Sequence, residues 1–121
     1  MEPAAVVDTS VVIGVMKNKI YVDALPAEDV FITAPTRYEL LVGAKDGRLR
    51  EKILEIPCID LDCDAAKIAG DIQRELYKSG EPAGNIDTLI AAVCIANGLP
   101  LITTDKGFQK FKRFGLRIIT P

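Results

Sequence analysis

Four acidic residues stand where carboxylates could do chemistry together: Asp8, Glu39, Asp87 and Asp105. Each follows a short apolar run or lies near the start of a segment with helical spacing. A carboxylate in apolar surroundings is costly unless its charge is compensated, and two carboxylates about 4 Å apart repel by ~1 kcal/mol in water. A divalent cation would remove this conflict. It would also activate water and stabilise charge on a phosphodiester during hydrolysis.

Each acid also has a purely structural explanation. Asp8 and Asp105 could cap the helices that follow them. Thr36 and Glu39 match the capping box Thr-x-x-Glu, and Asp87 lies in the first turn of a helix, where the helix dipole favours negative charge. These separate explanations are less convincing when the four acids are considered together. Helices that follow parallel strands begin at the same edge of a sheet, so we expect the four carboxylates to converge there.

The residue types narrow the chemistry further. The chain has no histidine, which excludes nucleophilic triads that use histidine and zinc sites built on imidazole. A metal would have oxygen ligands, which favours Mg²⁺ or Mn²⁺. Hydroxyl groups beside the acids could support a carboxylate or a metal-bound water, and they belong to Thr9, Ser10, Thr103 and Thr104. The three cysteines, Cys58, Cys63 and Cys94, are interpreted as small buried hydrophobic residues.

Strands and helices that would position these residues alternate along the chain. The run Ala4–Ile13 predicts a buried strand that ends at Asp8, with a helix starting at Thr9. Further strands are expected at 30–33, 57–62, 101–103 and 117–119, and further helices at 35–43, 48–55, 62–79, 86–97 and 105–114. In the helix after Pro35, the predicted buried positions are Tyr38, Leu40, Leu41, Val42 and Ala44. This pattern predicts one α/β domain over residues 1–121, with a mainly parallel sheet and its ligand site at the carboxyl ends of the strands.

The overall charge is nearly balanced, with 15 basic and 17 acidic residues and a net charge of −2. Nucleic-acid binding would therefore depend on a local basic patch. After Asp105 every charged residue is basic, and the candidates for contacts with nucleic-acid phosphates are Lys106, Lys110, Lys112 and Arg113. Three phenylalanines interleaved with these bases are interpreted as the buried stripe of a short helix. They are Phe108, Phe111 and Phe114.

The acidic residues and their neighbours resemble the PIN-domain family, and most closely its VapC-like toxins of toxin–antitoxin pairs. The matching segments are Val6–Val11, Thr36–Leu40, Asn85–Ala92 and Leu101–Phe108, in that order along the chain. The resemblance implies a three-layer α/β/α sandwich around a mainly parallel five-stranded sheet. It also implies an endoribonuclease that depends on Mg²⁺ or Mn²⁺ and hydrolyses RNA with metal-activated water.

The resemblance also assigns roles to individual residues. Asp8 and Asp87 would be the main metal ligands, Glu39 would help to hold metal and water, and Asp105 would bind or position a second ion. Ser10 and Thr104 match positions that usually carry a supporting polar side chain. The expected partners are RNA, a cognate antitoxin and a second copy of the chain in a homodimer.

Several alternatives stay open from the sequence. One is a housekeeping RNA-processing nuclease of the same fold, and another is a non-catalytic PIN domain that only binds RNA or protein. A phosphoacceptor receiver domain or a haloacid-dehalogenase-type phosphatase fits less well, because Thr9 and Ser10 stand where these proteins need a second acid. There is no long apolar stretch and no basic leader, so we expect a cytoplasmic protein with no membrane contact.

Overall fold

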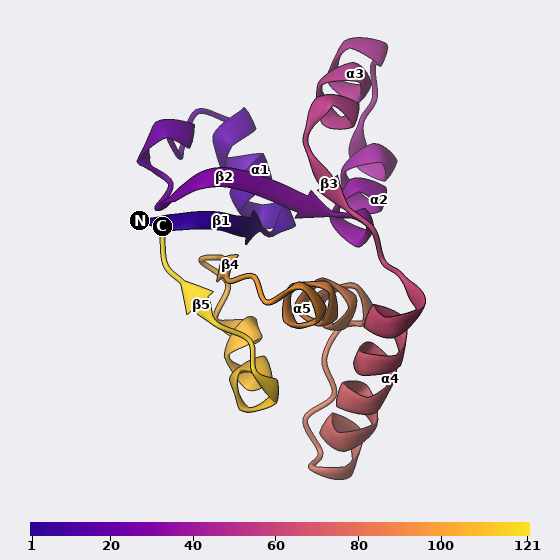
Figure 1. Cartoon of the computed structure of the whole chain (residues 1–121). Coiled ribbons are helices and arrows are strands. Elements are labelled where there is room, and N and C mark those ends of the chain that lie inside the picture. Colours follow the sequence, from indigo (N-terminus) through magenta and orange to yellow (C-terminus); the bar gives the residue numbers. More distant parts are fainter.

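The computed structural model describes residues 1–121, and its centre is a five-stranded parallel sheet (Figure 1). The strands lie in the order β3-β2-β1-β4-β5, and every neighbouring pair is parallel. Their bounds are β1 (Glu2–Val7), β2 (Ala27–Thr33), β3 (Cys58–Ile59), β4 (Leu101–Ile102) and β5 (Ile118–Ile119). The parallel sheet expected from the alternation of strands and helices is therefore confirmed.

The central strand, β1, is buried on both faces. Successive side chains of a strand point to opposite faces, so Ala5 and Val7 pack into one core and Val6 into the other. All three are at most 4% exposed. A continuous apolar run is what such a strand requires, and this explains why Asp8 marks its end.

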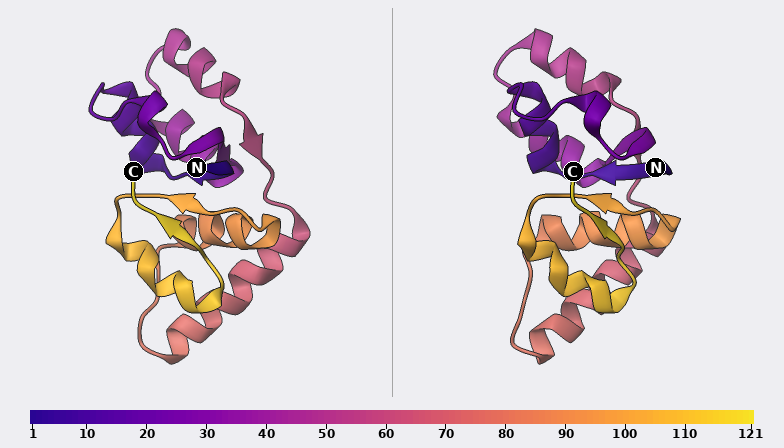
Figure 2. Two further views of the ribbon diagram at one scale, coloured as in Figure 1. Left: turned by 60° about the vertical axis from the view of Figure 1, so that its left-hand side comes forward. Right: turned by 90° about the vertical axis from the view of Figure 1, so that its left-hand side faces the viewer.

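Two layers of helices cover the two faces, as Figure 2 shows from two directions. On one face, Val11, Leu40 and Ile53 pack with Val7 in a common core. The elements of this layer are α1 (Thr9–Met16), the short 3₁₀ helix η1 (Val22–Ala24), α2 (Ala34–Gly43) and α3 (Gly47–Glu55). The opposite layer consists of α4 (Cys63–Lys78), α5 (Asn85–Asn97) and the 3₁₀ helix η2 (Lys106–Phe114).

The second core confirms the interpretation of two of the phenylalanines. Phe108 and Phe111 are fully buried and pack with Val6 and Ile90, while Phe114 lies partly buried at the margin. The helix expected at 105–114 forms as a 3₁₀ helix with Asp105 as its N-cap. The three-layer α/β/α sandwich is thus confirmed.

The order of the strands places a crevice beside β1. The chain passes from β1 to β2 on one side, and β4 returns to pair with the other side of β1. Such a reversal of direction opens a ligand-binding crevice at the carboxyl edge of a parallel sheet. Asp8 follows β1 directly and Thr103 follows β4 directly, so both residues lie at this edge.

The cap at the beginning of α2 decides between the two explanations of Glu39. Thr33, not Thr36, is the N-cap, and its hydroxyl accepts a hydrogen bond from the Thr36 backbone amide at 3.3 Å. The explanation of Glu39 as part of a capping box is therefore excluded, and Glu39 is free for another role. Tyr38 and Val42 were also expected to be buried but are 61% and 72% exposed, because this short helix turns only one narrow side to the core.

The cysteines are only partly as predicted. Cys94 is buried in α5, where burial raises the pKa of its thiol to about 12. Cys58 is half-buried, whereas Cys63 is exposed at the start of α4, so its predicted burial is wrong. None of the helices has the length and apolar character needed to cross a membrane.

Candidate active site

The four acidic residues singled out by the sequence line a single hollow, which we call the acidic cavity. It has a volume of about 240 Å³. Its walls come from the junction of β1 and α1, from α1, α2 and α5, from the loop after β4 and from η2. They consist of Asp8, Thr9, Ser10, Ile13, Glu39, Asp87, Ile90, Asp105 and Phe108. The structure therefore brings all four carboxylates to the sheet edge where they were expected to converge.

Asp8 is the most deeply placed of these acids, at 3% exposed. It caps α1, because its Oδ1 accepts the Val11 amide at 3.0 Å. The Ser10 hydroxyl lies 2.9 and 3.0 Å from the two carboxylate oxygens, and Thr103 Oγ1 donates to Oδ2 at 2.5 Å. These hydrogen bonds satisfy the oxygens of the buried Asp8 carboxylate and fix its orientation.

Thr103 also ties Asp8 to the last acid of the group. Its hydroxyl oxygen accepts the backbone amide of Asp105 at 2.9 Å while its hydrogen is donated to Asp8. Asp105 in turn accepts the Gly107 amide at 2.8 Å, which caps η2. The loop after β4 is thus held against the end of β1 by one buried hydroxyl.

Glu39 is held by a side chain from another helix. Thr9 on α1 donates to Glu39 Oε1 at 2.7 Å, and Thr9 Oγ1 also lies 3.3 Å from the hydroxyl oxygen of Thr36 on α2. The contact between Thr9 and Thr36 was not among the sequence predictions. The spacing Thr36-x-x-Glu39, one helical turn, was the available signal.

Asp87 has a different environment from the other acids. It lies in the first turn of α5, and its side chain has no hydrogen-bond partner within the protein. Burial raises the pKa of Asp87, and the nearby charges of Asp105, Glu39 and Asp8 raise it further, whereas Lys110 lowers it. Its carboxylate therefore carries the cost of bringing like charges together.

None of these four acids is neutralised by an ion pair. The three salt bridges of the protein join Lys67 to Asp71, Lys78 to Glu75 and Arg117 to Glu2, all outside the acidic cavity. No three of the acidic side chains lie close enough together to hold one metal ion among them. The cavity thus has excess negative charge and oxygen donors spread around its wall.

The remaining predicted site residues are Thr104 and the basic residues of η2. Thr104 is exposed and does not line the cavity, so the structure does not bring it to the acids. Arg113 stacks on the Phe114 ring at 4.4 Å and donates to Ser79 at 3.4 Å, on the side of α4. The lysines of η2 have no carboxylate partner, and Lys110 among them is half-buried near Asp87.

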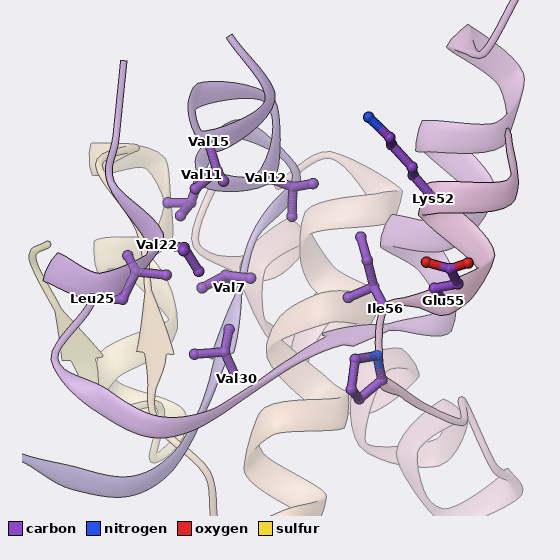
Figure 3. Close-up of a pocket in the computed structure, with 11 residues that line it drawn as sticks. Val7, Val11, Val12, Val15, Val22, Leu25, Val30, Lys52, Glu55 and Ile56 are labelled. Atoms are coloured by element: carbon purple, nitrogen blue, oxygen red, sulfur yellow. The ribbon is translucent and has the colours of Figure 1, made fainter. Parts of the chain in front are cut away.

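A second hollow lies on the face of the sheet covered by α1 (Figure 3). We call it the valine cavity; its volume is about 370 Å³, and its walls are Val7, Val11, Val12, Val15, Val22, Leu25, Val30, Lys52, Glu55, Ile56 and Pro57. Lys52 and Glu55 stand together on α3 at one side of it (Figure 3). It has no cluster of acids, so the chemistry of a carboxylate site belongs to the acidic cavity alone.

Comparison with known proteins identifies the family of the chain. The model of the family described as PIN domain matches residues 5–114. Ribonuclease VapC5 of Mycobacterium tuberculosis is 32% identical, and the match covers 87% of this chain and 85% of that protein. The tRNA(fMet)-specific endonuclease VapC of Shigella flexneri is 29% identical, with 89% of each chain covered.

Solved structures give the same result. VapBC-5 of Mycobacterium tuberculosis, a member of a family of toxin–antitoxin systems, matches with a TM-score of 0.73 and 30% identity over 98% of this chain and 99% of that chain. VapBC-1 of nontypeable Haemophilus influenzae matches with a TM-score of 0.80 and 22% identity over 97% of each chain, which shows the fold alone. The chain therefore belongs to the PIN-domain family, among its VapC-type ribonucleases.

Proposed function

We propose that this protein is the toxin of a toxin–antitoxin pair and that it cuts RNA internally by metal-dependent hydrolysis. The observation that carries the proposal is the acidic cavity, where four carboxylates line one hollow and no base is paired with any of them. Like charges held together without a counter-charge raise the free energy of the folded state. A divalent cation would relieve that cost.

The donor set fits Mg²⁺ or Mn²⁺ and does not fit a softer metal. The cavity offers carboxylate and hydroxyl oxygens, the chain has no histidine, and no cysteine lines the cavity. Mg²⁺ usually keeps several of its waters and uses only one or two carboxylates directly. This habit agrees with a site in which no three acids stand close enough together to ligate one ion.

The environments of the acids support the roles proposed for them. Ser10, Val11 and Thr103 donate three hydrogens to Asp8, so one of its four lone-pair directions stays free for an ion. Asp87 has both oxygens free, which suits a second main ligand. Glu39 would help to hold the ion and its water. When bound, the ion supplies activated water and stabilises charge on the phosphodiester.

Asp105 and the bases beside it would act around this centre. Asp105 would position a second ion, since its backbone and one carboxylate oxygen are fixed by Thr103 and Gly107. Lys106, Lys110 and Lys112 would attract the RNA phosphates, whereas Arg113 is already engaged with Phe114 and Ser79. These three lysines would thus place positive charge next to the acids that would hold the metal.

A groove beside the acidic cavity suits the antitoxin. It has a volume of about 430 Å³ and lies between α1, α2 and α3, with Thr9, Ile13 and Glu39 shared with the acidic cavity. Ile13 and Met16 leave more than a third of their apolar surfaces exposed in it. A segment of the antitoxin with apolar residues and a basic side chain would fill the groove and neutralise the acids together.

The biological setting follows from the same proposal. Because the substrate would be cellular RNA, we place the protein in the cytoplasm, as a homodimer when its antitoxin is absent. A toxin should arrest growth when it is expressed alone, whereas a housekeeping nuclease should not. Growth after induction of the wild type and of Asp87→Asn therefore distinguishes the toxin from an RNA-processing enzyme, and light scattering of the purified protein tests the dimer.

Cleavage of structured RNAs in Mg²⁺ or Mn²⁺, with and without EDTA, tests the enzymatic part. We expect the wild type to cut only with metal present and Asp87→Asn not to cut. Asp29→Asn, which removes the same charge from an exposed position on β2, is the matched control and should cut normally. Metal-independent cutting, or an active Asp87→Asn protein, would contradict the proposed site.

A further inference from the structure

Behind Glu39 lies a line of hydroxyl groups that the proposed catalytic roles do not use. Thr9 Oγ1 lies 2.7 Å from Glu39 Oε1 and 3.3 Å from Thr36 Oγ1. Thr36 Oγ1 in turn lies 3.4 Å from Thr33 Oγ1 at the end of β2. Three hydroxyls therefore connect the buried junction of β2 and α2 to a carboxylate on the wall of the acidic cavity.

Helix capping explains only part of this arrangement. The cap of α2 uses the Thr33 hydroxyl and the backbone amide of Thr36, and any residue except proline would supply that amide. The Thr36 side chain is 0% exposed, so its hydroxyl has lost its contact with water. Burying a hydroxyl costs free energy unless it is hydrogen-bonded, and valine would fill nearly the same space. Neither capping nor packing therefore explains why residue 36 carries a hydroxyl group.

The number of hydrogens sets the direction of the line. A carboxylate can only accept, so the single hydroxyl hydrogen of Thr9 goes to Glu39. The contact between Thr9 and Thr36 then requires the Thr36 hydroxyl as donor, and the Thr33 hydroxyl is left to donate to Thr36. Every hydroxyl in the line both donates and accepts, and all of them point toward Glu39.

The effect on Thr9 follows from its place in α1. Thr9 is the first residue of α1 and only partly buried, so water competes with Glu39 for its hydroxyl hydrogen. A donor fixed behind it at Thr36 favours the rotamer that points at Glu39.

We propose that Thr36 is a positioning residue, which acts through Thr9 to hold Glu39 in place for metal binding. The inference rests on the proposed function, because it assumes that Glu39 helps to hold the ion. The contact between Thr9 and Thr36 and the contact between Thr36 and Thr33, at 3.3 and 3.4 Å, are longer than usual hydrogen bonds between hydroxyls. We therefore expect a modest effect. Thr36 would thus affect the metal site although it does not line the acidic cavity.

Two substitutions at the same position separate the hydroxyl from the packing. Thr36→Val keeps the volume and loses the hydroxyl, while Thr36→Ser keeps the hydroxyl and loses a buried methyl group. We expect Thr36→Val to lower the Mn²⁺ affinity of the RNA-free protein about threefold and kcat about fivefold, with KM unchanged. Thr36→Ser should stay within about twofold of the wild type, although its thermal stability falls.

A double substitution tests whether the effect passes through Thr9. Thr9→Val should lower kcat by more than Thr36→Val, about tenfold, and the double variant should be no worse than Thr9→Val alone. Independent, multiplying losses would overturn the proposal. The proposal would also be overturned if the fall in kcat of Thr36→Val and Thr36→Ser simply followed the fall in their thermal stability. A fully active Thr36→Val would overturn it too.

The wild type separates this inference from the proposed function. If the wild type binds Mn²⁺ and cuts RNA but Thr36→Val matches it in both, only the role of Thr36 is wrong. If the wild type neither binds Mn²⁺, measured by electron paramagnetic resonance of the free ion, nor cuts RNA, both proposals are overturned together.

Discussion

The acidic cavity and the valine cavity both lie next to β1 and α1, yet one is lined by carboxylates and the other mainly by apolar side chains. Val7 and Val11 line the valine cavity, while Asp8 and Ser10, which lie between them in the sequence, line the acidic cavity. One short stretch of chain thus supplies walls to both. The valine cavity belongs to the packed layer that stabilises the fold, whereas the acidic cavity keeps like charges together at a cost in stability.

This comparison shows how activity and stability are divided in a small domain. Apolar side chains around Val7 contribute by leaving water, and none of them could take part in hydrolysis. The four acids would do the chemistry and, without a cation, destabilise the fold through repulsion. Substitutions in the two cavities should therefore have opposite effects, and the following predictions run from the largest expected effect to the smallest.

The largest effect should come from Asp87→Asn. Loss of a main metal ligand should lower the rate of RNA cleavage about a thousandfold, since each 1.36 kcal/mol added to the barrier costs a factor of ten. The metal-free protein should become more stable, because Asp87 has no hydrogen bond to lose and repels its neighbours. Single-turnover cleavage and thermal melting measure the two effects. An inactive and less stable variant would break the contrast between the cavities.

The opposite result should come from Leu25→Ala in the wall of the valine cavity. Leu25 is 3% exposed, so its truncation should lower the free energy of unfolding by about 2–4 kcal/mol. Cleavage per folded molecule should not change. Val22→Ala is the control, since Val22 lines the same cavity but is 57% exposed and should cost far less. Urea unfolding provides the free energies.

Asp8→Asn should be inactive like Asp87→Asn but less stable than it. An asparagine at position 8 that still accepts the Val11 amide would turn its own amide toward the Thr103 hydroxyl. The Thr103 hydroxyl hydrogen then loses its carboxylate acceptor, so a buried hydrogen bond is lost or weakened at a cost of about 1–3 kcal/mol. Equal stability of the two variants would mean that repulsion dominates at both positions.

The pH dependence of stability should report the charge of Asp87. Its pKa is raised in the folded protein, so folding favours its protonated form. That contribution is complete below the unfolded value of 3.8 and disappears as pH rises through the raised folded value. Without metal, the stability advantage of Asp87→Asn over the wild type should therefore grow from pH 4 upward. Urea unfolding of both proteins across this range measures it, and saturating Mn²⁺ should reduce the difference.

The smallest effect should come from Lys110→Gln. Lys110 lowers the pKa of Asp87, so its loss should move the acidic limb of the rate profile to higher pH. It should also raise KM for RNA about twofold to threefold at low salt, because one phosphate contact is lost. Lys19→Gln, on the exposed turn after α1, is a charge-matched control. A change in kcat without a shift in pH profile would argue against this role.

The sequence by itself determined the elements, the parallel sheet and the four acids. Apolar periodicity and caps are local properties, so α1 forms over Thr9–Met16 as predicted and Asp62 caps α4. The convergence of Asp8, Glu39, Asp87 and Asp105 also followed from a general rule, because the carboxyl ends of parallel strands share one edge.

Only the tertiary structure decided which partners these residues have. The Thr-x-x-Glu spacing allowed Thr36 to cap α2, but Thr33 at the end of β2 is the N-cap, and the Thr36 hydroxyl meets Thr9 instead. The exposure of Tyr38 depends on which side of α2 faces the core. The link from Thr103 to Asp8 joins residues 95 positions apart. Such contacts depend on how β1, β2 and β4 are arranged in space, and no local pattern in the chain encodes them.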